Sequence, residues 1–288
     1  MKTRNIGPNG RVVSFIDIGT NSVRLLVIRL NPNHSYIILS QQKQQIRLGE
    51  GEFEEEEILP EAIERLVIVC KKLTDLARTF STDEFVAVAT SAMREAANQH
   101  KILHLLRQEA QIDVRVISGH EEARLIYLGV SSGIHLGDRQ AFFIDIGGGS
   151  TEIAVGREQN YHYLESFKLG AIRLSNHYVS GDGTKPVSLD EYKKIQQHIK
   201  DANIHTIQKI RRQKPDLAIG SSGTIINLAE IAQKAILQNG STNSTILTYR
   251  DLRKVIDLLC SLPLDQRRKI SGINPERADI IIPGAAIL

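Results

Sequence analysis

Two segments of the sequence combine an aspartate with a glycine turn, a combination suited to binding phosphate. An apolar strand ends in Asp17 and breaks into the turn at residues 19–22, and a second apolar strand ends in Asp145 and breaks into the turn at residues 147–150. Glycine permits backbone angles and a close approach that a side chain prevents, so successive amides can converge on phosphate oxygens. Two such turns indicate a chain of phosphates rather than a single anion.

The two aspartates indicate a cation as well. A carboxylate beside a bound phosphate is favourable mainly when a hard cation such as Mg²⁺ lies between the two groups. The alternative is a pair of ordinary glycine hairpins in a sheet. Because Asp17 and Asp145 occupy matched positions before their turns, the repetition favours a functional role.

A third acidic group lies between the two turns, at residues 118–122. Glu121 follows Ser118 by three residues, the spacing of a helix capping box, so capping accounts for Glu121. Capping does not account for Glu122. The alternative account of Glu122 is a carboxylate stabilised by the positive end of the helix dipole, which would also help to keep the group ionised.

Alternating strands and helices must position these residues. The apolar patterns predict strands at 12–18, 23–30, 36–40, 85–89, 114–117, 139–145, 151–155, 161–169 and 216–219, and helices at 59–80, 90–110, 118–129, 188–209 and 225–238. A loop rich in glycine and serine near residues 131–138 separates two similar halves. We therefore expect a first domain over residues 1–131, which includes Glu122, and a second over residues 132–288.

Composition places the chain among ordinary globular proteins. Its 288 residues, with 41% apolar and 24% charged side chains, suffice for two domains with proper cores. No stretch approaches the roughly 20 apolar residues of a membrane span, and the N-terminus lacks the apolar region of a signal peptide. We expect a cytoplasmic protein without a membrane partner, in which Cys70 and Cys260 are reduced core thiols.

Charge gives little support for nucleic-acid binding. The net charge is only +3, and the densest basic run, at residues 209–214, closes a predicted helix, where cations are favourable. No specific partner of duplex nucleic acid is expected.

Each half is predicted to contain three antiparallel strands followed by a helix, a strand and a helix, with its glycine turn directed at a central cleft. This pattern predicts an α/β fold, the duplicated ribonuclease-H-like fold of actin-like ATPases, sugar kinases and Hsp70 proteins, with two domains around the cleft. A fold of this kind does not determine the reaction.

Seven motifs, in order along the chain, resemble those of the exopolyphosphatase / guanosine pentaphosphate phosphohydrolase (Ppx/GppA) family. They lie at residues 17–22, 89–94, 116–127, 143–152, 169–174, 219–224 and 275–279. The resemblance implies a Mg²⁺-dependent hydrolase that removes the terminal phosphate of inorganic polyphosphate or the 5′-γ-phosphate of pppGpp. It also implies a homodimer.

The resemblance assigns roles to individual residues. Glu122 matches the family's catalytic base, which would orient a water for in-line attack on the terminal phosphorus. Asp145 and Glu152 would hold Mg²⁺, and an outward-facing strand glutamate is the ordinary alternative for Glu152. Arg94 matches the family's phosphate-binding arginine, whose forked guanidinium suits phosphate. A surface salt bridge is the competing account of Arg94.

The remaining candidates would bind phosphate through amides and hydroxyl groups, or through Asp17, directly or by way of water. These phosphate-binding candidates are Asp17, Gly19, Thr20, Asn21, Ser22, Gly147, Gly148, Gly149, Ser150, Gly220, Ser221, Ser222, Gly223 and Thr224. The turn at residues 220–224 precedes a helix N-terminus, which favours an anion. We expect that turn to hold further phosphates or a guanosine.

Two departures from the family pattern bear on activity. The apolar segment at residues 280–288 resembles the start of a helix that the family continues, so we expect a truncated C-terminal helix. The helical domain of the longer family members is absent from this sequence, so a preference for shorter polyphosphate chains is expected.

Two other functions remain open on the sequence. An ATP-dependent kinase of the same fold would use an acceptor hydroxyl, whereas the Glu-Glu-Ala-Arg stretch at residues 121–124 favours water as the acceptor. A non-catalytic sensor would bind ppGpp or polyphosphate, whereas binding alone does not need Glu122, Asp145 and Glu152 together. Metal-dependent turnover would distinguish a hydrolase from a sensor.

Overall fold

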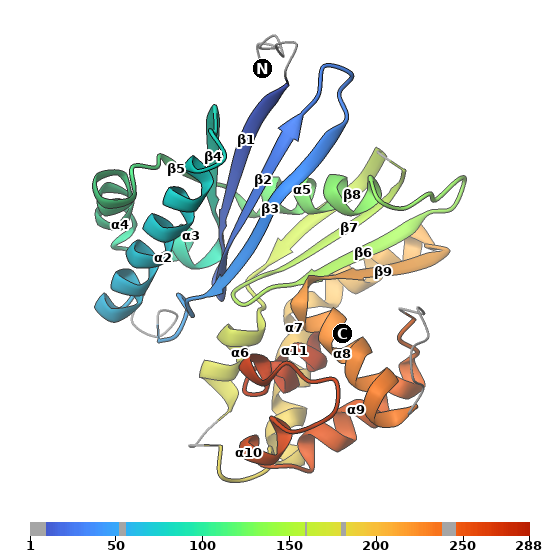
Figure 1. Cartoon of the computed structure of the whole chain (residues 1–288). Helices are drawn as coiled ribbons and strands as arrows, with labels where there is room; N and C mark the ends of the chain where they lie inside the picture. The colour runs from blue at the N-terminus through green and yellow to red at the C-terminus, as the bar shows by residue number, and fades with distance from the viewer. Residues whose placement is uncertain (1–9, 52–55, 159, 180–182, 238–245) are drawn as a thin grey trace. The chain divides into compact units, whose positions relative to one another are not determined.

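The chain folds as two α/β units, which divide between Ser118 and Gly119. The computed structural model describes residues 10–51, 56–158, 160–179, 183–237 and 246–288 (Figure 1). Within these ranges, none of the helices is both long enough and apolar enough to cross a membrane.

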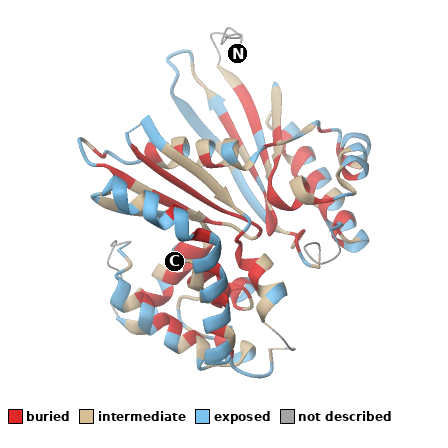
Figure 2. Ribbon diagram, turned by 180° about the vertical axis from the view of Figure 1, so that it is seen from behind, coloured by how far each residue is buried: buried red, intermediate tan, exposed pale blue. Residues whose placement is uncertain are grey.

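The first unit is built on a five-stranded sheet. Its strands are β1 (Arg11–Ile18), β2 (Ser22–Leu30), β3 (Tyr36–Gln45), β4 (Glu84–Ala89) and β5 (Val114–Val116), in the order β3-β2-β1-β4-β5. The first three strands are antiparallel to one another, while β4 runs parallel to β1 and β5 runs parallel to β4. The edge strand β3, which is longer than predicted, is exposed over most of its length (Figure 2).

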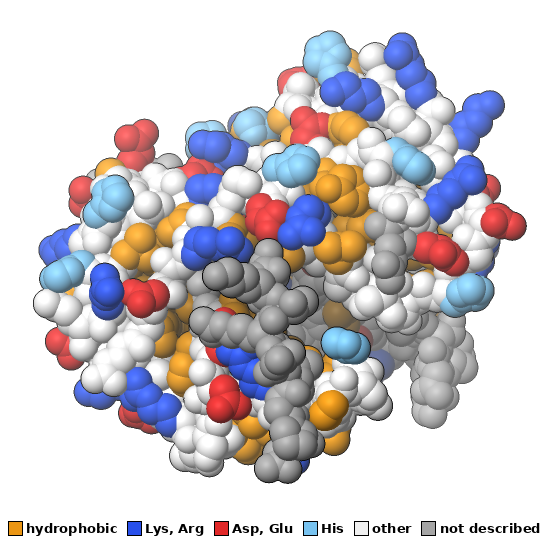
Figure 3. All heavy atoms as spheres, turned by 90° about the horizontal axis from the view of Figure 1, so that it is seen from above, with side chains coloured by type: hydrophobic (Ala, Val, Ile, Leu, Met, Phe, Trp, Pro, Cys, Tyr) orange, Lys and Arg blue, Asp and Glu red, His pale blue; other side chains and the backbone are white. Residues whose placement is uncertain are grey.

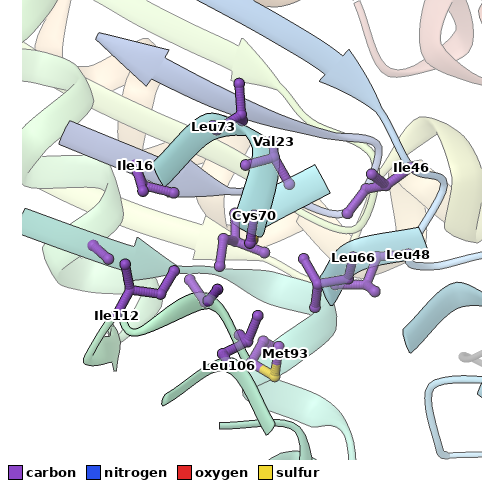
Figure 4. Close-up of a cluster of buried hydrophobic side chains, with 14 of the residues drawn as sticks. Ile16, Val23, Ile46, Leu48, Leu66, Cys70, Leu73, Met93, Leu106 and Ile112 are labelled. Atoms are coloured by element: carbon purple, nitrogen blue, oxygen red, sulfur yellow. The ribbon is translucent and has the colours of Figure 1, made fainter. Parts of the chain in front are cut away.

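Helices cover the first sheet and supply its core. They are α2 (Pro60–Arg78), α3 (Ser91–Glu95), α4 (Gln99–Leu105) and the π-helical turn η1 (Leu106–Ala110). The buried face of α2, with Leu66 and Cys70, packs in one cluster with Ile16 of β1 and Val23 of β2 (Figure 4). The single helix predicted at residues 90–110 is broken, because the backbone at Ala96 is extended rather than helical.

The second unit repeats this plan. A four-stranded sheet has the order β8-β7-β6-β9, from β6 (Ala141–Ile146), β7 (Thr151–Arg157), β8 (Asn160–Phe167) and β9 (Leu217–Ser221). Strands β6 to β8 are antiparallel, and β9 runs parallel to β6. Each strand therefore has a counterpart in the first unit, with β6 to β8 matching β1 to β3 and β9 matching β4. The predicted duplicated α/β fold is confirmed.

The helices of the second unit are more numerous. They are α5 (Gly119–Ser131), α6 (Ala171–Tyr178), α7 (Leu189–Gln213), α8 (Ser222–Ile231), α9 (Tyr249–Cys260), α10 (Leu264–Arg267) and α11 (Ile281–Ile287), with the short turns η2 (Ala232–Ile236) and η3 (Pro275–Arg277). As the sequence predicts, α7 begins with a complete capping box between Ser188 and Glu191.

Helix α5 belongs to the second unit, whereas the sequence suggested a boundary after residue 131. It packs on β7 and β8. Its Tyr127 is fully buried and makes an edge-to-face contact with Phe143 of β6, at 4.9 Å between ring centroids. The Tyr127 hydroxyl donates to the carbonyl oxygens of Glu158 (2.8 Å) and Asn160 (3.0 Å) in the β7–β8 hairpin. These contacts fix α5 to the second unit. Glu122, in the first turn of α5, therefore belongs to the second unit.

The surface carries both signs of charge. On the face drawn in Figure 3, lysine and arginine side chains are interspersed with acidic ones rather than gathered in one basic patch. This distribution agrees with the net charge of +3.

Candidate active site

The two glycine turns have the same geometry. The amide of Gly19 donates to the carbonyl oxygen of Ser22 at 3.0 Å, and the amide of Gly147 donates to that of Ser150 at 2.9 Å. The first turn joins β1 to β2 and the second joins the matching pair, β6 to β7. The repeat found in the sequence is therefore a repeat of structure.

The carbonyl groups of the three glycines in the second turn are bound from the side of α6. Gly147 accepts from the amide of Ala171 (3.0 Å), and Gly148 accepts from the amides of Ile172 (2.9 Å) and Arg173 (3.1 Å). The carbonyl of Gly149 accepts from Nε of Arg173 at 2.9 Å. In a trans peptide the carbonyl and the following amide point in opposite directions. The amides at positions 148, 149 and 150 are therefore turned away from α6.

The first turn is held in the same way by the segment that follows β3. The carbonyl of Thr20 accepts from the amide of Gly49 (3.1 Å), and that of Asn21 accepts from the amides of Ile46 and Arg47 (3.0 Å each). The hydroxyl of Thr20 also accepts from the amide of Ala92, at 3.3 Å. The amides at positions 21 and 22 thus face away from this segment, and the Thr20 side chain is used within the fold.

A row of polar side chains crosses the second sheet next to its turn. Asp145 of β6 lies directly opposite Glu152 of β7, Glu152 lies opposite Ser166 of β8, and Asp145 is in register with Ser221 of β9. Directly opposite residues project from the same face of a sheet. Ser166 donates to Glu152 at 2.8 Å, and Ser221 donates to Asp145 at 2.5 Å. The two carboxylates are neighbours, each held by a serine.

Glu152 is an unusual carboxylate because it is only 3% exposed. Burial raises its pKa, and the charges of Glu122 and Asp145 raise the pKa further, against hydrogen bonds from Ser150 and Ser166 that lower it. Glu152 is therefore not the outward-facing strand glutamate of the ordinary alternative. The charge of Glu122 thus acts on Glu152, and the three acidic residues predicted for the site all lie in the second unit.

Helix α5 packs on the second sheet near the acidic residues. Phe143 and Asp145 project from one face of β6, because alternate residues of a strand share a face, and Tyr127 covers Phe143. Glu122 precedes Tyr127 by five residues, or about 7.5 Å along a helix, and Asp145 follows Phe143 by about 6.6 Å along a strand. The rise along α5 is therefore similar to the separation along β6, while the five-residue step also turns Glu122 by about 140° around the helix from Tyr127.

Neighbouring Glu121 has a different environment. Its carboxylate accepts two hydrogen bonds from Arg124, from Nε at 2.8 Å and from Nη2 at 2.9 Å. This two-point ion pair orients Glu121 toward the next turn of α5 and distinguishes it from Glu122.

The first sheet has an equivalent row with the opposite charge. Asp17 of β1 lies opposite Arg24 of β2, and Arg24 lies opposite Lys43 of β3. Arg24 thus occupies the place that Glu152 has in the second sheet. Sequence reasoning did not single out Arg24, although it follows Asp17 by the same interval as Glu152 follows Asp145.

Arg94 lies in the last turn of α3 and is half-buried. Its Nη1 donates to the carbonyl of Ile117 at 3.0 Å. A guanidinium has five N–H donors, so this bond anchors the side chain with one of them. A role in binding phosphate stays a prediction.

The turn at residues 220–224 contains glycines that packing requires. A Cβ at Gly220 would collide with the side chain of Ile225, and a Cβ at Gly223 would lie 2.5 Å from Cζ of Arg277. The hydroxyl of Thr224 accepts from Nη1 of Arg277 at 3.4 Å. Ser222 has a positive φ of 83°. Close packing of Arg277 therefore accounts for much of this turn, and its role in binding phosphate stays a prediction.

Comparison with known proteins identifies the family. The model of the Ppx/GppA phosphatase family matches residues 26–288. The chain belongs to this family. Exopolyphosphatase 1 of Mycobacterium leprae is 29% identical over 278 residues, which are 96% of this chain and 80% of that protein.

Solved structures agree. An exopolyphosphatase from Cytophaga hutchinsonii has a TM-score of 0.86 at 26% identity, covering 96% of this chain and 88% of that one. The Ppx/GppA family member of Aquifex aeolicus has a TM-score of 0.72 at 25% identity, with coverage of 96% and 88%.

The acidic residues of this Ppx/GppA protein fit a magnesium ion. Asp145 and Glu152 offer only oxygen ligands, and their adjacent charges, one of them buried, call for a cation. Within the described ranges, no group of three or more acidic, histidine or cysteine side chains is placed to hold a metal ion. Mg²⁺ suits such a partial set, since it usually takes one or two carboxylates and completes its shell with water and phosphate.

A cavity of about 640 Å³ in the second unit of this Ppx/GppA protein is lined by other elements. It lies among α7, α9 and α11, with Tyr192, Leu252 and Ile256 in its wall. None of the predicted site residues lines it.

Proposed function

We propose that this chain is a Mg²⁺-dependent phosphohydrolase that removes the terminal phosphate of inorganic polyphosphate. The same chemistry extends to the 5′-γ-phosphate of pppGpp, because both substrates end in a phosphoryl group joined by a phosphoanhydride. Membership of the Ppx/GppA phosphatase family supports a phosphatase, and the relatives named as exopolyphosphatases support polyphosphate.

One observation carries the proposal. The charges of Glu122 and Asp145 both act on the buried Glu152, beside a turn whose three glycine carbonyls are bound from α6. Amides turned away from α6 are suited to phosphate oxygens, and carboxylates beside them are suited to a cation and to a reacting water. A binding protein without catalysis has no need of the third acid.

Glu122 is the proposed catalytic base. In the first turn of α5 it is near the positive end of the helix dipole, which favours the ionised form that a base requires. Its task is to orient a water in line with the terminal phosphorus and to accept the water's proton. Glu121 cannot share this task while it is paired with Arg124.

Asp145 and Glu152 are the proposed ligands of Mg²⁺. When bound, the ion neutralises negative charge on the transferred phosphoryl group and on the leaving phosphate chain. Ser166 and Ser221 fix the two carboxylates through their hydroxyl groups. Hydrogen bonds of this kind to a metal ligand usually improve its orientation and affinity.

Each unit, taken by itself, carries groups suited to phosphate. In the second unit these are the amides of Gly148, Gly149 and Ser150. In the first unit they are the turn at residues 19–22 and the cationic side chains of Arg24 and Arg94. Arginine suits this role because its fork makes two charge-assisted bonds to one phosphate.

The test compares two neighbouring glutamates. Phosphate release from medium-chain polyphosphate and from pppGpp is measured with Mg²⁺ or EDTA for the wild type, Glu122→Gln and Glu121→Gln. We expect Mg²⁺-dependent release, a loss of about 10²- to 10⁴-fold in kcat for Glu122→Gln, and a loss below about 10-fold for Glu121→Gln, which weakens the partly exposed ion pair with Arg124.

Other outcomes would reject the hydrolase. Tight binding of polyphosphate or ppGpp without phosphate release would indicate a sensor. Transfer of phosphate from ATP to an acceptor hydroxyl, with little release to water, would indicate a kinase. Equal losses in the two glutamate variants would reject Glu122 as the base.

A further inference from the structure

We propose that Arg173 is a positioning residue that holds the phosphate-binding turn at residues 147–150 in its working conformation. The inference rests on the proposed function and extends it to a residue outside the turn and outside the acidic group. Arg173 lies in the first turn of α6, and it acts on the turn through both its backbone and its side chain.

The turn and the start of α6 are packed so closely that residue 170 has no room for a side chain. A Cβ at Gly170 would lie 2.5 Å from the carbonyl carbon of Gly149 and would overlap the carbonyl group of Gly148. The backbone of Gly170 is extended, with φ −140°, so the glycine is needed for close approach rather than for its backbone angles. The hydroxyl of Thr151 donates to the carbonyl of Leu169 at 2.5 Å and joins the two segments again.

Three carbonyls of the turn are bound from α6, but by different kinds of donor. Backbone amides bind Gly147 and Gly148, whereas the side chain of Arg173 binds Gly149. Among the hydrogen bonds of the described residues, Arg173 provides the one side-chain donor to these three carbonyls. The orientation of the Gly149–Ser150 peptide therefore depends on the Arg173 side chain, which a substitution can remove without changing the backbone.

The Gly149 to Ser150 peptide is the place where this dependence matters. Fixing its carbonyl toward Arg173 directs the amide of Ser150 the opposite way, toward the proposed phosphate. The Ser150 side chain also interacts with Glu152, a proposed Mg²⁺ ligand. A rotation of this peptide would therefore disturb a phosphate donor and a metal ligand together.

At the matching position in the first unit, backbone amides bind the carbonyl. There the carbonyl of Asn21, which corresponds to Gly149, accepts from two amides, those of Ile46 and Arg47. In the second unit a guanidinium takes over this task. The second turn, with glycine at three successive positions, is also intrinsically the more flexible of the two.

The experiment compares Arg173→Met and Arg173→Lys with Arg211→Met, an exposed arginine of α7 in the same unit. Polyphosphate hydrolysis is measured well below the melting temperature of every variant. We expect kcat/KM to fall about 10- to 100-fold in both Arg173 variants, with part of the loss in kcat, and to stay within about twofold in Arg211→Met. The Arg173→Lys variant keeps the positive charge but lacks the directed Nε hydrogen bond to Gly149, so it should not restore activity.

A binding measurement separates this inference from the proposed function. In a Glu122→Gln background, titration of sodium tripolyphosphate with Mg²⁺ should show affinity at least about tenfold weaker when Arg173→Met is added. If the wild type releases no phosphate, the proposed function fails, and this titration still decides the role of Arg173. Unchanged affinity would overturn the inference.

The kinetic comparison provides two further outcomes against it. Full activity in Arg173→Lys would mean that only charge matters. An activity loss that disappears at lower temperature, in step with a lower melting temperature, would mean that Arg173 only stabilises the fold.

Discussion

Replacing Gly156 with alanine should disturb the packing of helix α5 on the second sheet. A Cβ at this position of β7 would lie 2.5 Å from the carbonyl oxygen of Asn160 and 2.8 Å from Cζ of Tyr127, and would overlap the tyrosine hydroxyl. Tyr127 must then move, because its ring is enclosed by Phe143 and Tyr161 and the new methyl cannot be placed beside it. The strain therefore falls on the helix that carries Glu122.

The size of the effect follows from two contributions. Overpacking a closely packed site costs about 1–3 kcal/mol, and weakening the hydroxyl bonds of Tyr127 adds about 0.5–1.5 kcal/mol. We expect a loss of about 1.5–4.5 kcal/mol, which lowers the melting temperature of a unit of this length by about 3–18 °C. Because a displacement near 1 Å can reduce catalysis about 10²-fold, kcat should fall by about 10- to 100-fold.

Gly129→Ala is the matched control. Gly129 is an exposed residue of α5, and a Cβ there would meet nothing within 4 Å. Alanine is favoured over glycine in a helix by about 0.8–1 kcal/mol, so this variant should be slightly more stable than the wild type. Thermal unfolding followed by circular dichroism, with polyphosphate hydrolysis in parallel, measures both variants. Equal melting temperatures for Gly156→Ala and Gly129→Ala would refute the reasoning.

Three further predictions concern other parts of the chain. Burial raises the pKa of Cys70 to about 12 and that of Cys260 to about 11, so a thiol reagent at mildly alkaline pH should label neither until its own unit unfolds in urea; rapid labelling of the folded protein would contradict this. Because the pKa of each thiol is raised, the stability that the protonated thiols contribute is present below the ordinary thiol pKa of 9.0 and is lost as the pH rises toward the pKa values of the folded protein. About 10 mM MgCl₂ should raise the wild-type melting temperature by about 3–6 °C for a dissociation constant near 1 mM, and Asp145→Asn should remove that shift. Arg267 is buried and donates to the carbonyls of Ala278 (2.8 Å) and Leu262 (3.2 Å), so Arg267→Met should lower the free energy of unfolding by about 2–4 kcal/mol, as measured in urea.

Local patterns made much of the fold predictable. Glycine turns after apolar strands indicate hairpins wherever they occur, and Ser188 with Glu191 indicates a helix start from spacing alone. The break at Ala96 was missed, because the apolar pattern on both sides of it suits a helix. The place of α5 was also beyond local reasoning, since it depends on Tyr127 packing against Phe143 and the β7–β8 hairpin.

The candidate site shows the same division between local and non-local information. Asp145 and Glu152 could be proposed from the motif, but their pairing across β6 and β7 and the burial of Glu152 need the register of the sheet. Ser166 was not identified because its only signal is its position opposite Glu152, on a strand whose alignment the sequence does not specify. Arg173 had no signal beyond the resemblance of residues 169–174 to a family motif.

The two sheets indicate how one structural unit can acquire two tasks. Their strand orders match, their turns close with the same hydrogen bond, and Asp17 and Asp145 occupy the same position. The residue opposite that aspartate differs: it is Arg24 in the first sheet and Glu152 in the second. An arginine balances its aspartate, whereas a second carboxylate in the same place creates an excess of negative charge that a divalent cation can neutralise. Under the proposed function, this change of charge at one cross-strand position contributes to making one copy suited to anions and the other suited to a metal ion.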